Sequence, residues 1–148
     1  MQTIGYTDSD RIRAVCGITE EDLDDTQLLA RGLDKELNID LLSWFPTAAD
    51  IAATGTDTQL DSLILYSTYF CAHLASQSLR MAATQKITDG ANALDRFANI
   101  DWDAMQSQLK ERAAFYKQFI VTSVGATVAV SFSMFSGVGL LVDPVTGS

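Results

Sequence analysis

The chain has 148 residues, a net charge of −9 and a sequence pI near 4.3, and 47% of its residues are hydrophobic. This length and hydrophobic content predict one folded domain with a buried core, which excludes a wholly disordered chain. Residues 1–57 carry twelve acidic side chains against four basic ones, and this acidity argues against a protein that grips nucleic-acid phosphates.

The first predicted helix is short and has clear signals at both ends. Asp8 or Ser9 can cap its N-terminus, and Gly17 is expected to end it. Ile12 and Val15 are expected to point inward from this helix, so the sequence predicts that it packs on the rest of the domain.

A longer helix is predicted after an acidic turn at residues 19–22, which Thr19 caps. Asp24 or Asp25 begins this helix, and the residues before Pro46 end it, because the residue before a proline resists helical geometry. One apolar ridge along it is formed by leucines at intervals of four: Leu29, Leu33, Leu37 and Leu41.

The longest predicted helix begins at Asp57, after a connector at residues 47–56 with one helical turn around Ile51. Residues 63–74 are apolar on nearly all sides, so we expect this helix at the buried centre of a bundle. The residues that follow an interval of three or four are Leu60, Leu63, Ser67, Phe70, Leu74, Gln77 and Met81.

A polar crossing is predicted at residues 87–100, with a turn at Gly90 and with apolar contacts to the bundle from Ile87, Leu94 and Phe97. Asp101 then caps the last predicted helix. Its inward-facing residues are expected to be Trp102, Met105, Leu109, Tyr116 and Ile120.

The C-terminal stretch differs from everything before it. Residues 124–142 carry no charge, and from Thr127 to Met134 apolar and small polar side chains alternate, which is the period of a β-strand. The fold class is therefore predicted as mainly α, with a small helical bundle of about four helices in residues 1–123. Residues 124–148 are predicted to be an extended or β-hairpin C-terminal arm.

Three arrangements of this arm are open from the sequence. It can pair in trans with another chain, since a strand without a partner leaves backbone groups unsatisfied. It can form a hairpin at residues 136–137 that folds back on its own bundle. Residues 119–142 are also long enough to cross a bilayer. In the first arrangement, the contacting residues are Val124, Val128, Val130, Phe132, Met134, Phe135, Leu140, Leu141 and Val142.

The sequence contains no motif that indicates a catalytic site, a cofactor site or a metal site. His73 is the only histidine, and its helical context favours a packing role. Cys16 and Cys71 are expected to be small buried thiols. The acidic run at residues 20–25 lacks the glycine and terminal glutamate of a calcium loop, and no glycine-rich phosphate loop occurs. We therefore expect no enzymatic activity.

The order of these segments resembles the head-to-tail connector, or adaptor, proteins of tailed bacteriophages. The strings that carry the resemblance lie in residues 8–121: RIRAVCG, ITEEDLDD, QLLARGLDKELNIDLL, LDSLILYSTYFCAHLASQSLRM, ITDGANALDRF and DWDAM. The resemblance implies a small helical protein without catalytic activity that forms a ring, usually of about twelve copies, beneath the portal protein.

As an adaptor, the chain is expected in the virion neck, between capsid and tail, after assembly in the host cytoplasm. Its partners are then the portal protein, neighbouring copies of itself and the downstream neck or tail protein, while DNA passes without sequence-specific binding. No membrane is involved in this interpretation. Some acidic side chains of the N-terminal third are expected to face the channel.

Two other classes of protein are alternatives to an adaptor. A tail-anchored small membrane protein would use residues 119–142 as its span. A small terminase-like packaging subunit would need a basic helix-turn-helix face, and no segment here has one.

Overall fold

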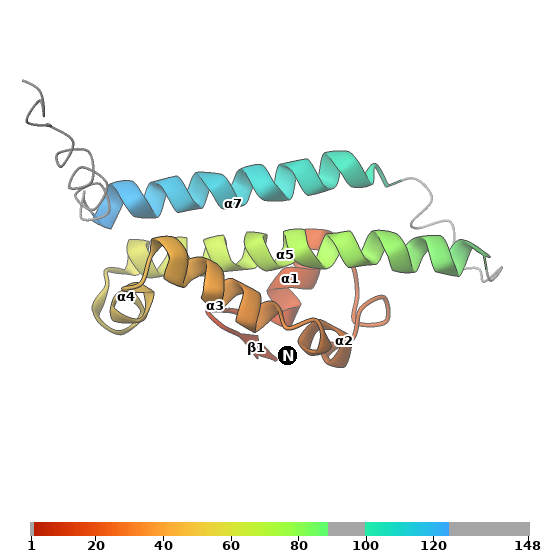
Figure 1. Ribbon diagram of the computed structural model, residues 1–148, viewed down its shortest axis with the longest axis horizontal. Helices are drawn as coiled ribbons and strands as arrows, with labels where there is room; N and C mark the ends of the chain where they lie inside the picture. Colours follow the sequence, from red (N-terminus) through yellow and green to blue (C-terminus); the bar gives the residue numbers. More distant parts are fainter. Residues whose placement is uncertain (1, 89–99, 125–148) are drawn as a thin grey trace, which may run out of the picture.

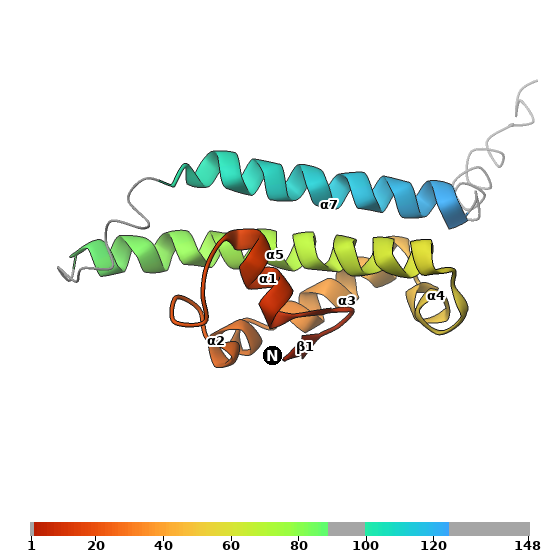
Figure 2. The same ribbon diagram turned by 180° about the vertical axis from the view of Figure 1, so that it is seen from behind.

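The computed structural model describes residues 2–88 and 100–124. Two long helices, α5 (Asp57–Thr88) and α7 (Trp102–Val124), lie side by side and antiparallel (Figures 1 and 2). The N-terminal elements pack on the side of α5 that α7 leaves open, with α3 (Leu33–Trp44) and α1 (Ser9–Cys16) at opposite faces of the molecule. The predicted central position of α5 is therefore confirmed.

A two-strand hairpin that the sequence did not predict begins the chain. β1 (Thr3–Ile4) pairs antiparallel with β2 (Thr7–Asp8), and Gly5 takes a positive φ of 58° in the turn between them. A contact of 2.7 Å between the hydroxyls of Thr7 and Thr68 fastens the hairpin to α5. Strands of two residues are too short to show an alternating pattern.

The first helix, α1 (Ser9–Cys16), has the predicted ends. The Asp8 carboxylate accepts a hydrogen bond of 2.9 Å from the Arg11 backbone N–H, and Gly17 follows the helix with a φ of 68°. Ile12 is fully buried and Val15 is half-buried against the core. Both predicted inward-facing residues therefore pack inward.

The predicted continuous helix before Pro46 is wrong. The chain forms α2 (Asp25–Ala30) and α3 (Leu33–Trp44), separated at Gly32, whose φ is 67°. Asp24 caps α2 through a capping box with Gln27, as the predicted start requires. Because the chain turns at Gly32, Leu29 is 38% exposed, whereas Leu33, Leu37 and Leu41 form the expected buried ridge.

The connector carries a helix, α4 (Ala48–Thr54), before α5 begins at Asp57 as predicted. The expected burial of residues 63–74 of α5 is wrong only at Leu65, which is 37% exposed. Small side chains fill much of its buried face, and their hydroxyls donate to carbonyls of their own helix, so neighbouring elements can approach closely. These small buried residues are Ser62, Ser67, Thr68, Cys71, Ala72, Ala75 and Ser76.

The last described helix, α7, begins as predicted, with the Asp101 carboxylate accepting a hydrogen bond of 3.0 Å from the Ala104 N–H. Leu109 and Ile120 are buried, and the other predicted inward-facing residues of α7 are half-buried against the core. The predicted mainly helical fold is thus confirmed, but the described part of the chain has six helices instead of about four, because Gly32 separates α2 from α3 and the connector forms α4. The predicted turn of the polar crossing and the arm beyond residue 124 lie outside that part.

Candidate functional site: an apolar groove beside α7

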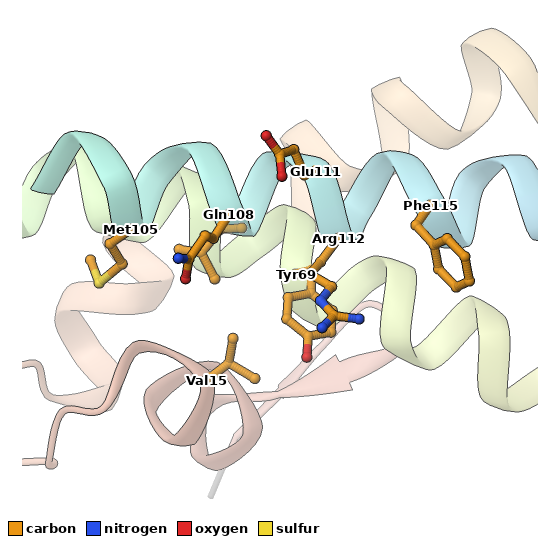
Figure 3. A pocket seen from close by; sticks show the side chains of 8 residues that line it. Val15, Tyr69, Met105, Gln108, Glu111, Arg112 and Phe115 are labelled. Carbon is orange, nitrogen blue, oxygen red and sulfur yellow. The ribbon is translucent and has the colours of Figure 1, made fainter.

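A groove of about 660 Å³ runs between α1 and α7, with α5 beneath it (Figure 3). Each of the three helices supplies side chains to it, and apolar groups predominate. Its lining residues are Val15, Tyr69, Met105, Gln108, Leu109, Glu111, Arg112 and Phe115. Phe115 is 58% exposed at one end of this groove. A groove of this size and composition is suited to accept apolar side chains of another segment.

A second hollow of about 430 Å³ adjoins the first between α1 and α5. The two share Val15, so the apolar surface continues across α1. Leu65 and Ile64 line this second hollow from α5, together with Arg11, Ala14, Asp61 and Thr68. The apolar surface is therefore wider than the α7 groove alone.

Aromatic contacts hold Phe115 in its exposed position. Tyr69 of α5 stacks on Tyr116 of α7 with ring centroids 5.7 Å apart, and Phe115 meets the Tyr116 ring edge-on at 5.3 Å. Phe119 follows one helical turn later and is 40% exposed. Burying a fully exposed phenylalanine contributes about 1.5–3 kcal/mol, so covering these partly exposed rings would contribute a fraction of that for each ring.

A separate apolar surface lies on α3. Ile39 is 69% exposed and Leu42 is 58% exposed, and the interval of three residues places them on one side of the helix. Since α3 and α1 occupy opposite faces of the molecule, this surface is distinct from the groove (Figures 1 and 2). The protein therefore presents two different apolar surfaces.

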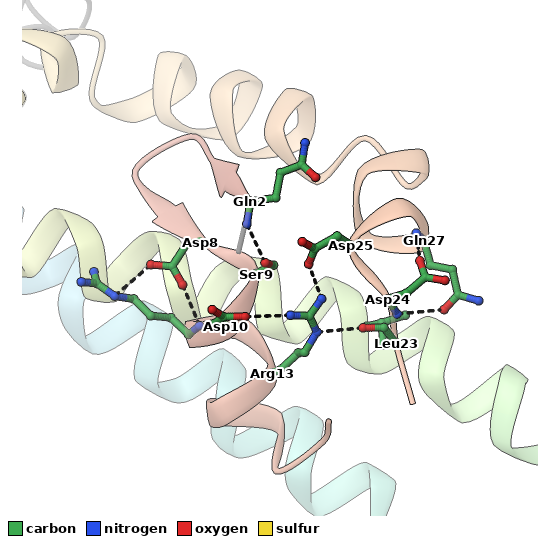
Figure 4. Close-up of polar contacts among 10 residues, drawn as sticks. Gln2, Asp8, Ser9, Asp10, Arg13, Leu23, Asp24, Asp25 and Gln27 are labelled. Atoms are coloured by element: carbon green, nitrogen blue, oxygen red, sulfur yellow. Dashed lines mark hydrogen bonds and ion pairs between the residues drawn. The ribbon is translucent and has the colours of Figure 1, made fainter. Parts of the chain in front are cut away.

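The acidic N-terminal third contains a buried ion-pair network (Figure 4). The Arg13 guanidinium, only 4% exposed, donates to the Leu23 carbonyl at 2.8 Å, to Asp10 at 2.9 Å and to Asp25. Hydrogen bonds from Ser9 and Arg13 lower the pKa of Asp25 to about 2. These contacts tie α1 to the start of α2, so part of the acidity has a structural role.

Asp40 has a similar role at the end of α3. Its carboxylate accepts hydrogen bonds from Trp44 Nε1 at 2.8 Å and from the Tyr66 hydroxyl. Burial, and then the contact with Asp40, raise the pKa of Tyr66 well above its usual value. The ammonium of Lys117 lies 4.6 Å from the centroid of the Trp44 ring, which links α3 to α7.

Many acids of the N-terminal third lie at the surface, and Asp10 of the Arg13 network is among them. The exposed ones are Asp10, Glu20, Glu21, Asp24, Asp34, Glu36, Asp50 and Asp57. Whether any of them faces a channel depends on an assembly, so the expected acidic channel stays a prediction.

Of the nine residues predicted to contact a partner, only Val124 lies in the described part of the chain. It is the last residue of α7, and it packs half-buried against the core. The other eight lie outside the described residues.

His73 packs between the two long helices. Its Nδ1 lies 3.2 Å from the Gln106 carbonyl oxygen of α7, and its Nε2 lies 3.3 Å from the Gln77 amide of its own helix. Burial raises the pKa of both the Cys16 and the Cys71 thiols to about 12. Within residues 2–88 and 100–124, no group of three or more histidine, cysteine or acidic side chains is placed to hold a metal ion.

No helix in the described ranges combines the length and apolarity that a membrane span requires.

Sequence reasoning missed Phe115 and Phe119 as candidate contact residues. They fall outside the inward-facing set predicted for this helix, yet they lie four residues apart and so share one side of it. A pair of phenylalanines on the outer side of an otherwise polar surface was the signal that could have identified them.

Comparisons of the chain with protein-family models, with curated proteins and with solved structures find no match.

Proposed function

We propose that the protein is a structural virion protein, a head-to-tail adaptor that forms a ring under the portal of a tailed bacteriophage. The ring seals the head and gives neck or tail proteins a docking platform while DNA passes through an acidic channel. The observation that supports this most is the succession of elements over residues 8–121. The described elements of that succession are a short helix before Gly17, an acidic turn, a long central helix and a final helix that opens after Asp101. The leucine-rich helix of the resemblance is divided at Gly32, and most of the polar crossing lies outside the described residues.

The two apolar surfaces suit assembly into a ring. A ring closes through head-to-tail contacts, in which one surface of each subunit meets a different surface of the next. The α3 surface with Ile39 and Leu42 and the α7 surface with Phe115 and Phe119 are different and lie on different elements. We propose that they contribute to contacts between neighbouring copies.

The exposed acids fit a bore through which DNA passes. Acidic side chains repel the phosphate backbone, and in a ring of many copies the repulsion adds up. Such a surface would let DNA move without adhering to the wall.

We further propose that the uncharged segment at residues 124–142 is an arm that pairs with the portal or with an adjacent subunit. The nine predicted contact residues, from Val124 to Val142, would supply the apolar side of that contact. A strand added to another chain satisfies its backbone through main-chain hydrogen bonds.

The test is a phage that encodes a chain shortened to residues 1–124, so that α7 stays complete. We expect a soluble helical protein by circular dichroism, and heads that lack attached tails. Normal tailed particles containing the shortened protein would show that the arm hypothesis is wrong. Absence of the full-length chain from purified virions would overturn the adaptor proposal itself.

A tail-anchored membrane protein is the alternative from another class. Only residues 119–124 of its supposed span are described, and they form the last turns of α7. Fractionation separates the two functions, because a membrane protein sediments with lipid and needs detergent for release, whereas an adaptor sediments with phage particles.

A further inference from the structure

The most exposed large apolar side chains of the described residues lie on two helices. Ile39 and Leu42 of α3 are 69% and 58% exposed, and Phe115 of α7 is 58% exposed. Phe119, one turn farther along α7, is 40% exposed. Side chains of this kind lose contact with water when they pack on each other, which favours a contact between the two surfaces.

The helix α3 presents its exposed pair from a fixed position. The buried leucines of this helix, Leu33, Leu37 and Leu41, lie on the side opposite to Ile39 and Leu42. Because the helix is anchored by these leucines, a partner that covers its outer side orders little that is not already ordered. The outer side of α3 is therefore suited to dock in a groove as a preformed helix.

Each helix also has one charge of its rarer sign close to the exposed apolar side chains. Lys35 is the only basic residue of α3, and it comes four residues before Ile39. Glu111 is the only acidic residue of α7 after Asp103, and it comes four residues before Phe115. Both charged side chains are exposed, and Glu111 stands at the rim of the groove (Figure 3). The two surfaces are therefore complementary in charge.

The spacing of these side chains agrees when α3 lies parallel to α7. With Lys35 level with Glu111, the next exposed side chains, Ile39 and Phe115, are level about 6 Å farther along both helices. The last side chains of the two rows differ by one position, which is about 1.5 Å along the axis. The groove also offers Arg112 to the acids beside Lys35. One orientation thus brings together the charged pair and the apolar pairs.

The α3 of a chain cannot reach the groove of the same chain. The groove lies on the α1 side of α5, and α3 lies at the opposite face of the molecule (Figures 1 and 2). The α3 that enters the groove therefore comes from another copy. Because each copy uses two different surfaces, such contacts continue from copy to copy and do not end at a two-fold dimer.

We infer that α3 of one copy docks along the groove of a second copy, parallel to the α7 of that copy. Lys35 then lies beside Glu111. The apolar pair of α3 covers Phe115 and Phe119. The inference rests on the proposed ring of copies, for which it names the contact.

The net charge of −9 on each copy opposes this association at low ionic strength. At an ionic strength of about 0.15 M the Debye length is about 8 Å, so repulsion between distant acids is screened much more than an ion pair in contact. The experiments are therefore done at this ionic strength.

Cross-linking of the full chain tests the orientation. Chains with Ser43→Cys are mixed with chains that carry either Thr122→Cys or Ser107→Cys and treated with a short bis-maleimide. All three positions are exposed; position 43 follows the apolar pair of α3, and positions 122 and 107 lie toward opposite ends of α7. The native Cys16 and Cys71 are buried with a raised pKa, so they react slowly.

Parallel docking brings position 43 close to position 122 and leaves position 107 about 22 Å farther along α7. We expect the product linked between positions 43 and 122 to form at least about tenfold faster than the product linked between positions 43 and 107. Circular dichroism checks that each variant is folded. Equal rates for the two products, or no linked product, would overturn the inference.

Charge reversal tests the pair of Lys35 and Glu111. Lys35→Glu makes the chain more negative and Glu111→Lys makes it less negative, so general repulsion would shift the association constant in opposite directions. The inferred contact predicts instead that each change lowers this constant at least about fivefold. The chain with both changes restores the pair in reverse and should associate within about twofold of the unchanged chain.

Lys110→Glu is the matched control, because Lys110 is exposed beside Glu111 but does not line the groove. It should leave the association constant within about twofold. Sedimentation velocity measures these constants, and stronger association of the Glu111→Lys chain would overturn the inference. The adaptor proposal is tested separately, by the presence of the chain in purified virions, so that either idea can fail while the other stands.

Discussion

The N-terminal third and the outer face of α7 differ in how far their side chains are buried and partnered within the chain. In the N-terminal third, the buried guanidinium of Arg13 has a carbonyl and two carboxylates as partners, and Leu37 and Ile12 are almost fully buried. On α7, Phe115 and Phe119 remain exposed beside a groove. In the N-terminal third the exposed large apolar side chains are confined to one side of α3 and to Leu29, whereas on α7 they lie beside a groove.

The largest expected effect on stability is in the N-terminal third. Leu37→Ala should lower the free energy of unfolding by about 2–5 kcal/mol, because it leaves a cavity at a residue only 1% exposed. Ile39→Ala, two residues along the same helix and 69% exposed, should change it by less than about 0.5 kcal/mol. Urea unfolding measures both, and equal effects would contradict the packing described for α3.

The ion-pair network should give the next effect. Arg13→Met should cost about 3 kcal/mol, since it leaves the Leu23 carbonyl and Asp25 without their guanidinium partner. Arg11→Met is the control, because the half-exposed Arg11 pairs with Asp8 at 3.2 Å, so its loss should cost less than about 1 kcal/mol. A similar cost for the two changes would show that Arg13 is not the link between α1 and α2.

The same network predicts a pH dependence. The pKa of Asp25 is lowered from an ordinary value of 3.8 to about 2, so its contribution to stability is complete above about pH 4 and is lost as the pH falls toward 2. Urea midpoints of the unchanged chain and of Asp25→Asn should differ at pH 6 and converge near pH 2. A difference that stays constant with pH would contradict the role of this carboxylate.

The smallest effect on stability is expected on α7. Phe115→Ser and Phe119→Ser should each lower the free energy of unfolding by about 1–2 kcal/mol at most, since Phe115 is 58% exposed and Phe119 is 40% exposed. The same changes should impair joining of the protein to phage particles, measured as its amount in purified virions. Ala114→Ser, at another exposed position of α7, should leave that amount unchanged.

Capping residues and glycines made much of the fold predictable. Asp8 and Gly17 delimit α1, Asp57 begins α5, and Asp101 caps α7, all as local hydrogen-bonding rules require. The leucines at intervals of four suggested one straight helix before Pro46. However, an exact four-residue interval drifts by about 40° per step around a 3.6-residue helix, so it cannot mark one buried line over many turns. The chain turns at Gly32, and this turn separates α2 from α3.

The candidate site was less predictable. The alternation of side chains in residues 127–134 predicts an extended arm. All of the predicted contact residues of this arm except Val124 lie outside the described part of the chain. The groove forms where α1, α5 and α7 converge, from residues as distant in sequence as Val15 and Phe115. Such a surface depends on tertiary packing, which no local pattern encodes.

Cryo-electron microscopy of the neck in purified virions tests the central claim most directly. The adaptor proposal predicts a ring of this chain between the portal and the tail, with Phe115 and Phe119 covered and with residues 124–142 in contact with another chain. A neck that contains no copy of this chain would contradict it.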